Sequence, residues 1–210
     1  MKRPAYRIES ERLVARCWQP SDAQTLRTAL DDNDSHLRPY IPWMRDEPRP
    51  LEATAQRLRA ARAAFDGDDD YKYALFEPGE ERLAGEVVLL SRAGPGALEI
   101  GYWIDRHLAG RGLATEAAAA VTRVAFEALQ VDRVEIHHSA ANAPSAGVAR
   151  RLGFTQDGTL RRRANDSDGV VRDLTVWSLF ADEYPGSPAS RVAIFAYDCM
   201  GRSIPLDGSI

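Results

Sequence analysis

The stretch His107-Leu-Ala-Gly-Arg-Gly-Leu-Ala-Thr-Glu116 connects an expected strand to an expected helix. The strand covers Leu98–Ile104, and the helix begins at Ala114 and reaches Leu129. Glycines let the backbone of such a turn approach a ligand closely, and the first amides of the helix point at negative charge. The turn is therefore compatible with an anion site, although these residues fit a glycine turn without a ligand about equally well.

The glycine spacing separates this turn from two other phosphate loops. Gly110 and Gly112 stand one residue apart, and the small Ala114 follows two residues later. The dinucleotide fingerprint needs three glycines in G-x-G-x-x-G, and the P-loop ends in Gly-Lys-Ser/Thr. Neither pattern is present, so an anion bound here is held by a different kind of loop.

The composition indicates one domain with a hydrophobic core. The chain has 210 residues, of which 44% are hydrophobic, and its formal net charge is -4. This charge argues against a nucleic-acid surface and favours small cationic partners. Cys17 and Cys199 lack metal-ligand spacing, so we expect free thiols and no metal site. The absence of an apolar leader and of a membrane-length run predicts a cytoplasmic protein.

The hydrophobic pattern before the glycine turn predicts strands and helices in succession. We expect a helix that is opened by a capping box at Ser21–Gln24 and ended by the acidic run Asp31–Asp34. The proline-broken segment Leu37–Met44 fits either a core-packed connector or a wall of a binding site. The other expected elements are a first strand at Glu11–Cys17, a helix at Leu51–Phe65, and a hairpin of Tyr71–Phe76 with Leu83–Leu90.

After the glycine turn we expect the longest helix of the protein, because its alanine run has high helix propensity. Next come a strand at Arg133–His138, a short helix with Gly153 as its C-cap, and a hairpin of Phe154–Arg163 with Val170–Leu179. One domain is expected over residues 1–184. Residues 185–210 form a tail of unknown role, whose apolar run Arg191–Tyr197 could be a strand without an assigned partner.

The order of these motifs resembles the GNAT superfamily of N-acetyltransferases. Within it the chain looks most like the RimJ/RimL-like branch, the ribosomal-protein N-terminal acetyltransferases. The matching motifs are Glu11-Arg-Leu13, the segment Leu37–Trp43, Glu99-Ile-Gly-Tyr-Trp103, the loop Gly110–Glu116 with its Ala-Thr-Glu, Asn142-Ala-Pro-Ser145, and Leu152-Gly-Phe154.

The resemblance implies an α/β GNAT fold, with a mixed, mostly antiparallel central sheet, flanking helices, and splayed fourth and fifth strands. It also implies acetyl-CoA as co-substrate, no membrane or nucleic-acid partner, and a monomer or homodimer. The residues that match the coenzyme-binding positions are Trp103, Ile104, Ala109, Gly110, Arg111, Gly112, Leu113, Ala114, Thr115, Asn142 and Ser145.

Two positions depart from the family pattern. Ala109 stands where Gln or Arg is common, and Ala149 stands where many members carry the tyrosine that protonates the leaving thiolate. RimL-like members use a serine at the position of Ser145 instead. Ser145 also fits a helix N-cap, and the two roles are compatible.

Transfer to an amine also needs a base and a donor for the oxyanion. The resemblance makes Glu99 the first candidate base and Glu86 the second, while each also fits a solvent-facing strand residue. The oxyanion donor is expected to be a backbone amide near Trp103 or Ile104. His137 and His138 lie on opposite strand faces, and the run Arg161–Arg163 is a solvated strand end or a phosphate contact.

The sequence therefore predicts an acetyl-CoA-dependent N-acetyltransferase that transfers acetyl directly to a primary amine. The acceptor is expected to be a protein or peptide N-terminus. A small-amine acetyltransferase, for an amino acid, polyamine or aminoglycoside, is the alternative. A catalytically weak acyl-CoA-binding module also stays open, because the usual tyrosine is absent.

Overall fold

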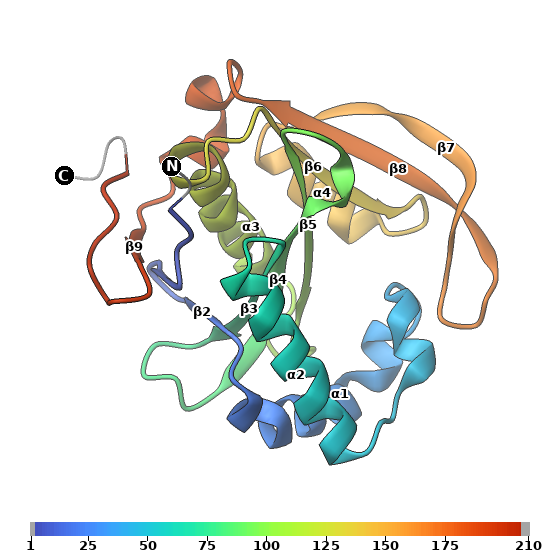
Figure 1. The fold of residues 1–210 in the computed structure, drawn as a ribbon. Helices are drawn as coiled ribbons and strands as arrows, with labels where there is room; N and C mark the ends of the chain where they lie inside the picture. Colours follow the sequence, from blue (N-terminus) through green and yellow to red (C-terminus); the bar gives the residue numbers. More distant parts are fainter. Residues whose placement is uncertain (1–2, 207–210) are drawn as a thin grey trace.

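The fold is an open mixed sheet with helices on both faces (Figure 1). The computed structural model describes residues 3–206, so the outermost residues of the expected domain and tail, 1–2 and 207–210, lie outside it. Within this range the sheet has nine strands in the order β7-β8-β6-β5-β4-β3-β2-β1-β9, and β5 and β6 form its parallel pair. The expected mixed, mostly antiparallel sheet is thereby confirmed.

The strands follow the expected hydrophobic runs, except β1, which was not predicted. Their bounds are β1 Arg7–Glu9, β2 Val14–Cys17, β3 Asp70–Phe76, β4 Leu83–Leu90, β5 Ala97–Ile104, β6 Arg133–Ser139, β7 Thr155–Asn165, β8 Val171–Phe180 and β9 Phe195–Tyr197. The expected first strand was too long at its start, because residues 10–13 turn between β1 and β2. There the Ser10 amide donates to the Leu13 carbonyl at 2.9 Å.

Two pairs of helices cover the two faces of the sheet. The helices are α1 Ala23–Leu37, α2 Leu51–Asp66, α3 Leu113–Arg123 and α4 Ala143–Arg151. The core cluster on the α1–α2 side contains Leu26, Leu58 and Trp103, whereas Ile100 belongs to the cluster around α3. None of the helices within residues 3–206 is long and apolar enough to cross a membrane.

Strand β5 separates from β6 half-way along its length. The parallel register pairs Ala97–Ile100 with Arg133–Ile136 and extends no further. Beyond Ile100, β5 stays paired with β4, while β6 stays paired with β8. The expected splay of the fourth and fifth strands is therefore present between β5 and β6.

Two expectations about α1 and its start were wrong. The expected capping box at Ser21 lies two residues earlier, between Gln19 and Asp22. The acidic run at residues 31–34 does not end α1, because Arg27 and Arg38 each form an ion pair with an aspartate of that run, four residues away.

The helix after the glycine turn is not the longest one. Its α-helical part, α3, has 11 residues, whereas α2 has 16. The chain continues from α3 as a π-helical turn at Val124–Ala128. Ala117–Ala120 are all buried, which lets α3 pack closely on the sheet.

The stretch after Tyr184 adds a strand to the sheet and apolar side chains to its core. Strand β9 pairs antiparallel with β1, which supplies the partner that the sequence left unassigned. Ile194, Ala196 and Ile204 are buried in the cluster that contains α3. Residues beyond 184 therefore help to form the sheet edge that carries β1.

Candidate active site

A cavity of about 710 Å³ lies where β5 and β6 separate. The glycine turn, the start of α3 and the start of α4 form one part of its wall, and the end of α1 forms another. The expected site residues that line it are Trp103, Ile104, Ala109, Gly110, Gly112, Leu113, Ala114, Thr115, Asn142 and Ser145. Arg111 and Glu99 are not among the lining residues.

The glycine turn is open toward the cavity. Gly110 and Gly112 have φ angles of 77° and 82°, a region that side chains with a Cβ rarely occupy. A Cβ at Gly110 would have no atom within 4 Å, so a ligand can reach this backbone. The first helical hydrogen bond of α3 runs from Glu116 N to Gly112 O, which leaves the amides before Glu116 for a ligand. These groups fit a pyrophosphate.

Two of the sequence motifs meet at this turn. Arg12 donates from its guanidinium to the Arg111 carbonyl at 2.8 Å and forms an ion pair with Glu116 at 2.6 Å. The Glu116 carboxylate also accepts from the Ser10 hydroxyl at 2.8 Å. The β1–β2 turn thereby braces the glycine turn, and Arg111 contributes its carbonyl to this brace.

Ser145 is not the N-cap of α4. The cap is Asn142, whose side-chain oxygen accepts from the Ser145 amide at 3.2 Å. The Ser145 hydroxyl instead lies 2.8 Å from the Tyr102 hydroxyl, and both residues line the cavity. Burial raises the pKa of Tyr102 to about 12, although the hydrogen bond with Ser145 lowers it. Tyr102 therefore keeps its proton at neutral pH.

Tyr102 and Trp103 place the two sides of the sheet in contact with one cavity. Successive residues of a strand point to opposite faces. Tyr102 packs against the α3 cluster and meets Ser145 of α4, whereas Trp103 belongs to the cluster under α1 and α2. The cavity therefore passes through the sheet at the splay, with a glycine-turn side and an α1 side.

The backbone of β5 offers amides at the same place. The Asp105 amide donates to the Ala84 carbonyl of the β4 side at 2.8 Å. Because amide directions alternate along a strand, the Trp103 amide faces β4, while the amides of Tyr102 and Ile104 face the gap left by β6. Of the two expected oxyanion donors, Ile104 fits and Trp103 does not.

The surroundings of Glu99 argue against its expected role as a base. Glu99 is 3% exposed and lies before the splay, where β5 is still paired with β6. Arg92 donates to its carboxylate at 2.7 Å, and His137 lies at 3.2 Å. Burial raises the pKa of Glu99, but these two partners outweigh it and hold the pKa at about 2. A carboxylate with this pKa is a poor proton acceptor at neutral pH.

Replacing Glu99 with Gln is expected to lower stability and to change activity little. The folded pKa lies below the ordinary value of 4.5, so the ionised group stabilises the fold above pH 4.5 and loses that effect as the pH falls toward 2. Urea denaturation should show a deficit on the order of 2 kcal/mol at pH 7 that shrinks toward pH 3. Equal deficits at both pH values would contradict this ion-pair role.

Glu86 has different surroundings on the neighbouring strand. It is 7% exposed and lies directly opposite Trp103 on the α1 side of the sheet. One carboxylate oxygen accepts from the Trp18 indole at 2.7 Å. Within residues 3–206 no arginine, lysine or histidine forms an ion pair with it, so this buried carboxylate lacks a cation. The alternative of a solvent-facing strand residue is wrong for Glu86, and also for the buried Glu99.

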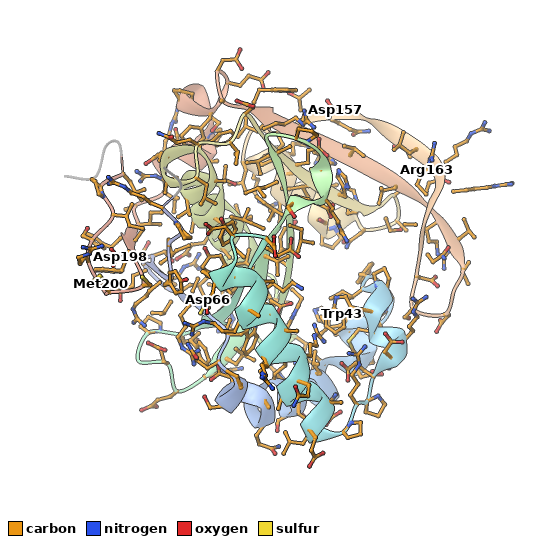
Figure 2. All side chains as sticks on the ribbon, viewed as in Figure 1. Trp43, Asp66, Asp157, Arg163, Asp198 and Met200 are labelled. Atoms are coloured by element: carbon orange, nitrogen blue, oxygen red, sulfur yellow. The ribbon has the colours of Figure 1, made fainter. Side chains whose placement is uncertain are left out.

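Neither Glu86 nor the remaining sequence candidates are among the residues that line the cavity. His137 contacts Glu99 and Glu135, while His138 accepts from the Trp177 indole at 2.9 Å on the opposite face of β6. The residues Arg161–Arg163 form an exposed bulge of β7 and line a separate groove. Figure 2 shows Arg163 on this hairpin, projecting outward.

The segment between α1 and α2 is both connector and cavity wall. Leu37 and Met44 are buried, and Leu37 lines the cavity together with the exposed Tyr40 and the half-buried Ile41. Trp43, labelled in Figure 2, packs under the Arg57 guanidinium, which lies 4.1 Å from its ring centre. Both expectations for this segment hold, and Leu37 fulfils both of them.

Sequence reasoning missed three polar residues that line the cavity, namely His36, Tyr102 and Arg151. Tyr102 was part of a quoted motif, but only the fold places its hydroxyl next to Ser145. Arg151 lines the cavity, and its guanidinium donates to the Thr115 hydroxyl at 3.3 Å near the start of α3. A phosphate bound at this place would be a second acceptor for the guanidinium. The position of Arg151 just before Leu152-Gly-Phe154 was the available signal.

The family model described as "Acetyltransferase (GNAT) domain" matches residues 12–155. The chain belongs to this GNAT acetyltransferase family. "Probable N-acetyltransferase YjcK" of Bacillus subtilis (strain 168) is 25% identical over 82% of this chain and 96% of its own length. "Putative ribosomal N-acetyltransferase YdaF" of the same organism is 29% identical over 84% of this chain and 96% of its own length.

Solved structures of GNAT proteins share the fold. A structure described as a probable acetyltransferase has a TM-score of 0.74 at 27% identity, with 82% of this chain and 95% of that chain covered. RimJ of Mycobacterium smegmatis, in complex with CoA-disulfide, has a TM-score of 0.75 at 24% identity and covers 91% of this GNAT chain and 92% of its own. RimL in complex with coenzyme A has a TM-score of 0.75 at 21% identity, and the match covers 87% of this chain and 99% of the RimL chain. RimJ and RimL give their names to the branch that the motifs resemble, and at these identities the likeness shows the shared fold.

Proposed function

We propose that this GNAT protein transfers the acetyl group of acetyl-CoA directly to the N-terminal α-amine of a protein or peptide. The observation that carries the proposal is the cavity through the splayed sheet. It combines an anion site at the glycine turn with a separate acceptor side under α1. YdaF, whose name refers to ribosomal N-acetylation, supports a protein acceptor.

Acetyl-CoA would enter from the side of α3 and α4. The amides at the start of α3 and the Arg151 guanidinium would hold its pyrophosphate. The Ile104 amide would donate to the acyl oxygen as negative charge develops there. The free amine would attack the thioester carbon, and the carbon–sulfur bond would break.

Ser145 and Tyr102 would deliver a proton to the departing thiolate. The Ser145 hydroxyl would donate to sulfur while the Tyr102 hydroxyl donates to Ser145 across their 2.8 Å contact. This pair offers an acid although Ala149 occupies the position of the usual tyrosine, which favours an enzyme over a weak acyl-CoA-binding module. The proton lost by the amine would pass to Glu86, directly or through water.

The Ser145→Ala and Tyr102→Phe variants test this proton path. Each is expected to lower kcat on the order of tenfold to a hundredfold with little change in the acetyl-CoA constant, because a thiolate is a good leaving group. The double variant should lose much less than the product of the two single losses, since both changes interrupt one path. Multiplicative losses, or a kcat within twofold of the parent, would contradict the path.

The acceptor class is tested by thiol release and by mass spectrometry. Thiol release with DTNB needs the background Cys199→Ser, because Cys199 is exposed and would react, whereas Cys17 is buried. The panel should contain peptides with a free α-amine, the same peptides with a blocked N-terminus and one lysine, and polyamines. Acetylation of the free α-amine alone supports the proposal. Acetylation of polyamines alone establishes the small-amine alternative, and no thiol release with any amine supports the binding module.

A further inference from the structure

One buried polar side-chain atom within residues 3–206 has no hydrogen-bond partner, the indole Nε1 of Trp103. An indole N–H can only donate, and a buried donor without an acceptor costs about 1–3 kcal/mol. Trp103 is 5% exposed and nevertheless lines the cavity. Burying the Trp103 N–H therefore costs free energy, and a hydrogen bond to an oxygen of a bound molecule would remove this cost.

The location of Trp103 indicates which molecule brings that oxygen. Its side chain lies on the α1 side of the sheet, opposite the side where Tyr102, Ser145 and α3 meet. A thioester held by the glycine turn comes from the α3 side, and its oxygen is served by the β5 backbone. The acceptor molecule, on the α1 side, is therefore the one that meets the indole.

Glu86 adds the second half of this subsite. It is the residue directly opposite Trp103 on the adjacent strand, and such pairs have Cβ atoms about 5 Å apart. Its buried carboxylate has the Trp18 indole as a partner but no cation from the described part of the chain. Burying a carboxylate without a cation is costly, and an ammonium group supplies the missing charge.

We infer that Glu86 and Trp103 form a subsite for an α-ammonium group and the carbonyl oxygen one carbon away from it. Glu86 receives the ammonium, and the Trp103 N–H donates to the carbonyl of the first residue. The Trp103 N–H is shielded, and Glu86 lies beside Trp103 but does not line the cavity. Small side-chain adjustments on ligand entry bring both groups into contact with the acceptor. The inference rests on the proposed function and narrows its acceptor to α-amino acyl compounds, against amines without a neighbouring carbonyl.

The test compares two substrates in the parent and in Trp103→Phe, which removes the N–H and keeps an aromatic ring. One substrate is a short peptide amide with a free α-amine, and the other is a diamine without a carbonyl, each assayed by thiol release in the Cys199→Ser background. For the peptide, kcat/KM is expected to fall tenfold or more, since the transition state loses a hydrogen bond. For the diamine, any rate that the parent shows is expected to fall by a smaller factor, because the diamine has no carbonyl that could lose a hydrogen bond.

Two controls accompany this comparison. Circular dichroism melting and the acetyl-CoA dissociation constant should be close to the parental values, because Trp103→Phe leaves the glycine turn intact. Equal losses for both substrates, or no loss for the peptide, would overturn the subsite and leave the proposed function standing. A parent enzyme that acetylates the diamine but no peptide would overturn the proposed acceptor and this subsite together.

Discussion

Replacing Gly112 with Asp is expected to weaken acetyl-CoA binding by on the order of 2 kcal/mol or more, which is about thirtyfold in Kd. Gly112 has a φ of 82° at the start of α3, where the amides face the proposed pyrophosphate. An aspartate adds a negative charge close to that anion. Its Cβ would lie 3.6 Å from a guanidinium nitrogen of Arg12, so the new side chain also disturbs the contacts that brace the glycine turn. Isothermal titration calorimetry with acetyl-CoA measures the change.

A matched control is available at the tip of the β7–β8 hairpin. Gly169 has a φ of 79°, and a Cβ there would have no atom within 4 Å. Gly169→Asp therefore imposes the same backbone strain and the same added charge away from the cavity. It should leave the acetyl-CoA constant unchanged. An unchanged constant in Gly112→Asp as well would refute the assignment of the glycine turn.

Replacing Glu86 with Gln is expected to lower kcat/KM for a peptide amine on the order of a hundredfold at pH 7. An α-amine is partly protonated at this pH, so the site must attract the ammonium form and take up its proton. The substituted amide keeps the shape of the side chain and can still accept from Trp18, but it has no charge. Activity should recover partly at high pH, where free amine is abundant. The pH profile of kcat/KM, measured by thiol release, shows this recovery.

Glu99→Gln on the next strand is the matched control for charge. Both glutamates are buried in the same sheet, but Glu99 has Arg92 and His137 as partners, whereas Glu86 has no ion-pair partner among the described residues. We therefore expect Glu86→Gln to lose activity and Glu99→Gln to lose stability. Full activity with the parental pH profile in Glu86→Gln would remove Glu86 from the proton path.

The local features of the site could be read from the sequence. Gly110 and Gly112 must adopt backbone angles that other residues avoid, and Asn142-Ala-Pro marks a helix start. Both features depend on residues that are neighbours in the chain, so the spacing of those residues in the sequence is enough to predict them. The strand and helix runs are visible for the same reason, because hydrophobic periodicity follows local geometry.

The chemical roles of the glutamates depended on the tertiary structure. Glu99 matched a family motif, but its ion pairs come from Arg92 in a preceding turn and His137 on β6. Glu86 looked like an ordinary strand residue until the sheet register placed it opposite Trp103 and next to Trp18. A pKa depends on the groups within a few ångströms, and most of those groups come from distant parts of the chain.

By itself, the sequence determined the family, the position of the glycine turn and the runs of the strands other than β1, because local patterns and the order of the motifs carry them. Only the tertiary structure decided that Tyr102 meets Ser145 and that β9 joins β1. It also decided that Trp103 has a buried N–H without a partner among the described residues. These features arise at the gap between β5 and β6 and where segments distant in the sequence pack together. The pattern of residues along the chain does not show which side chains meet at these places.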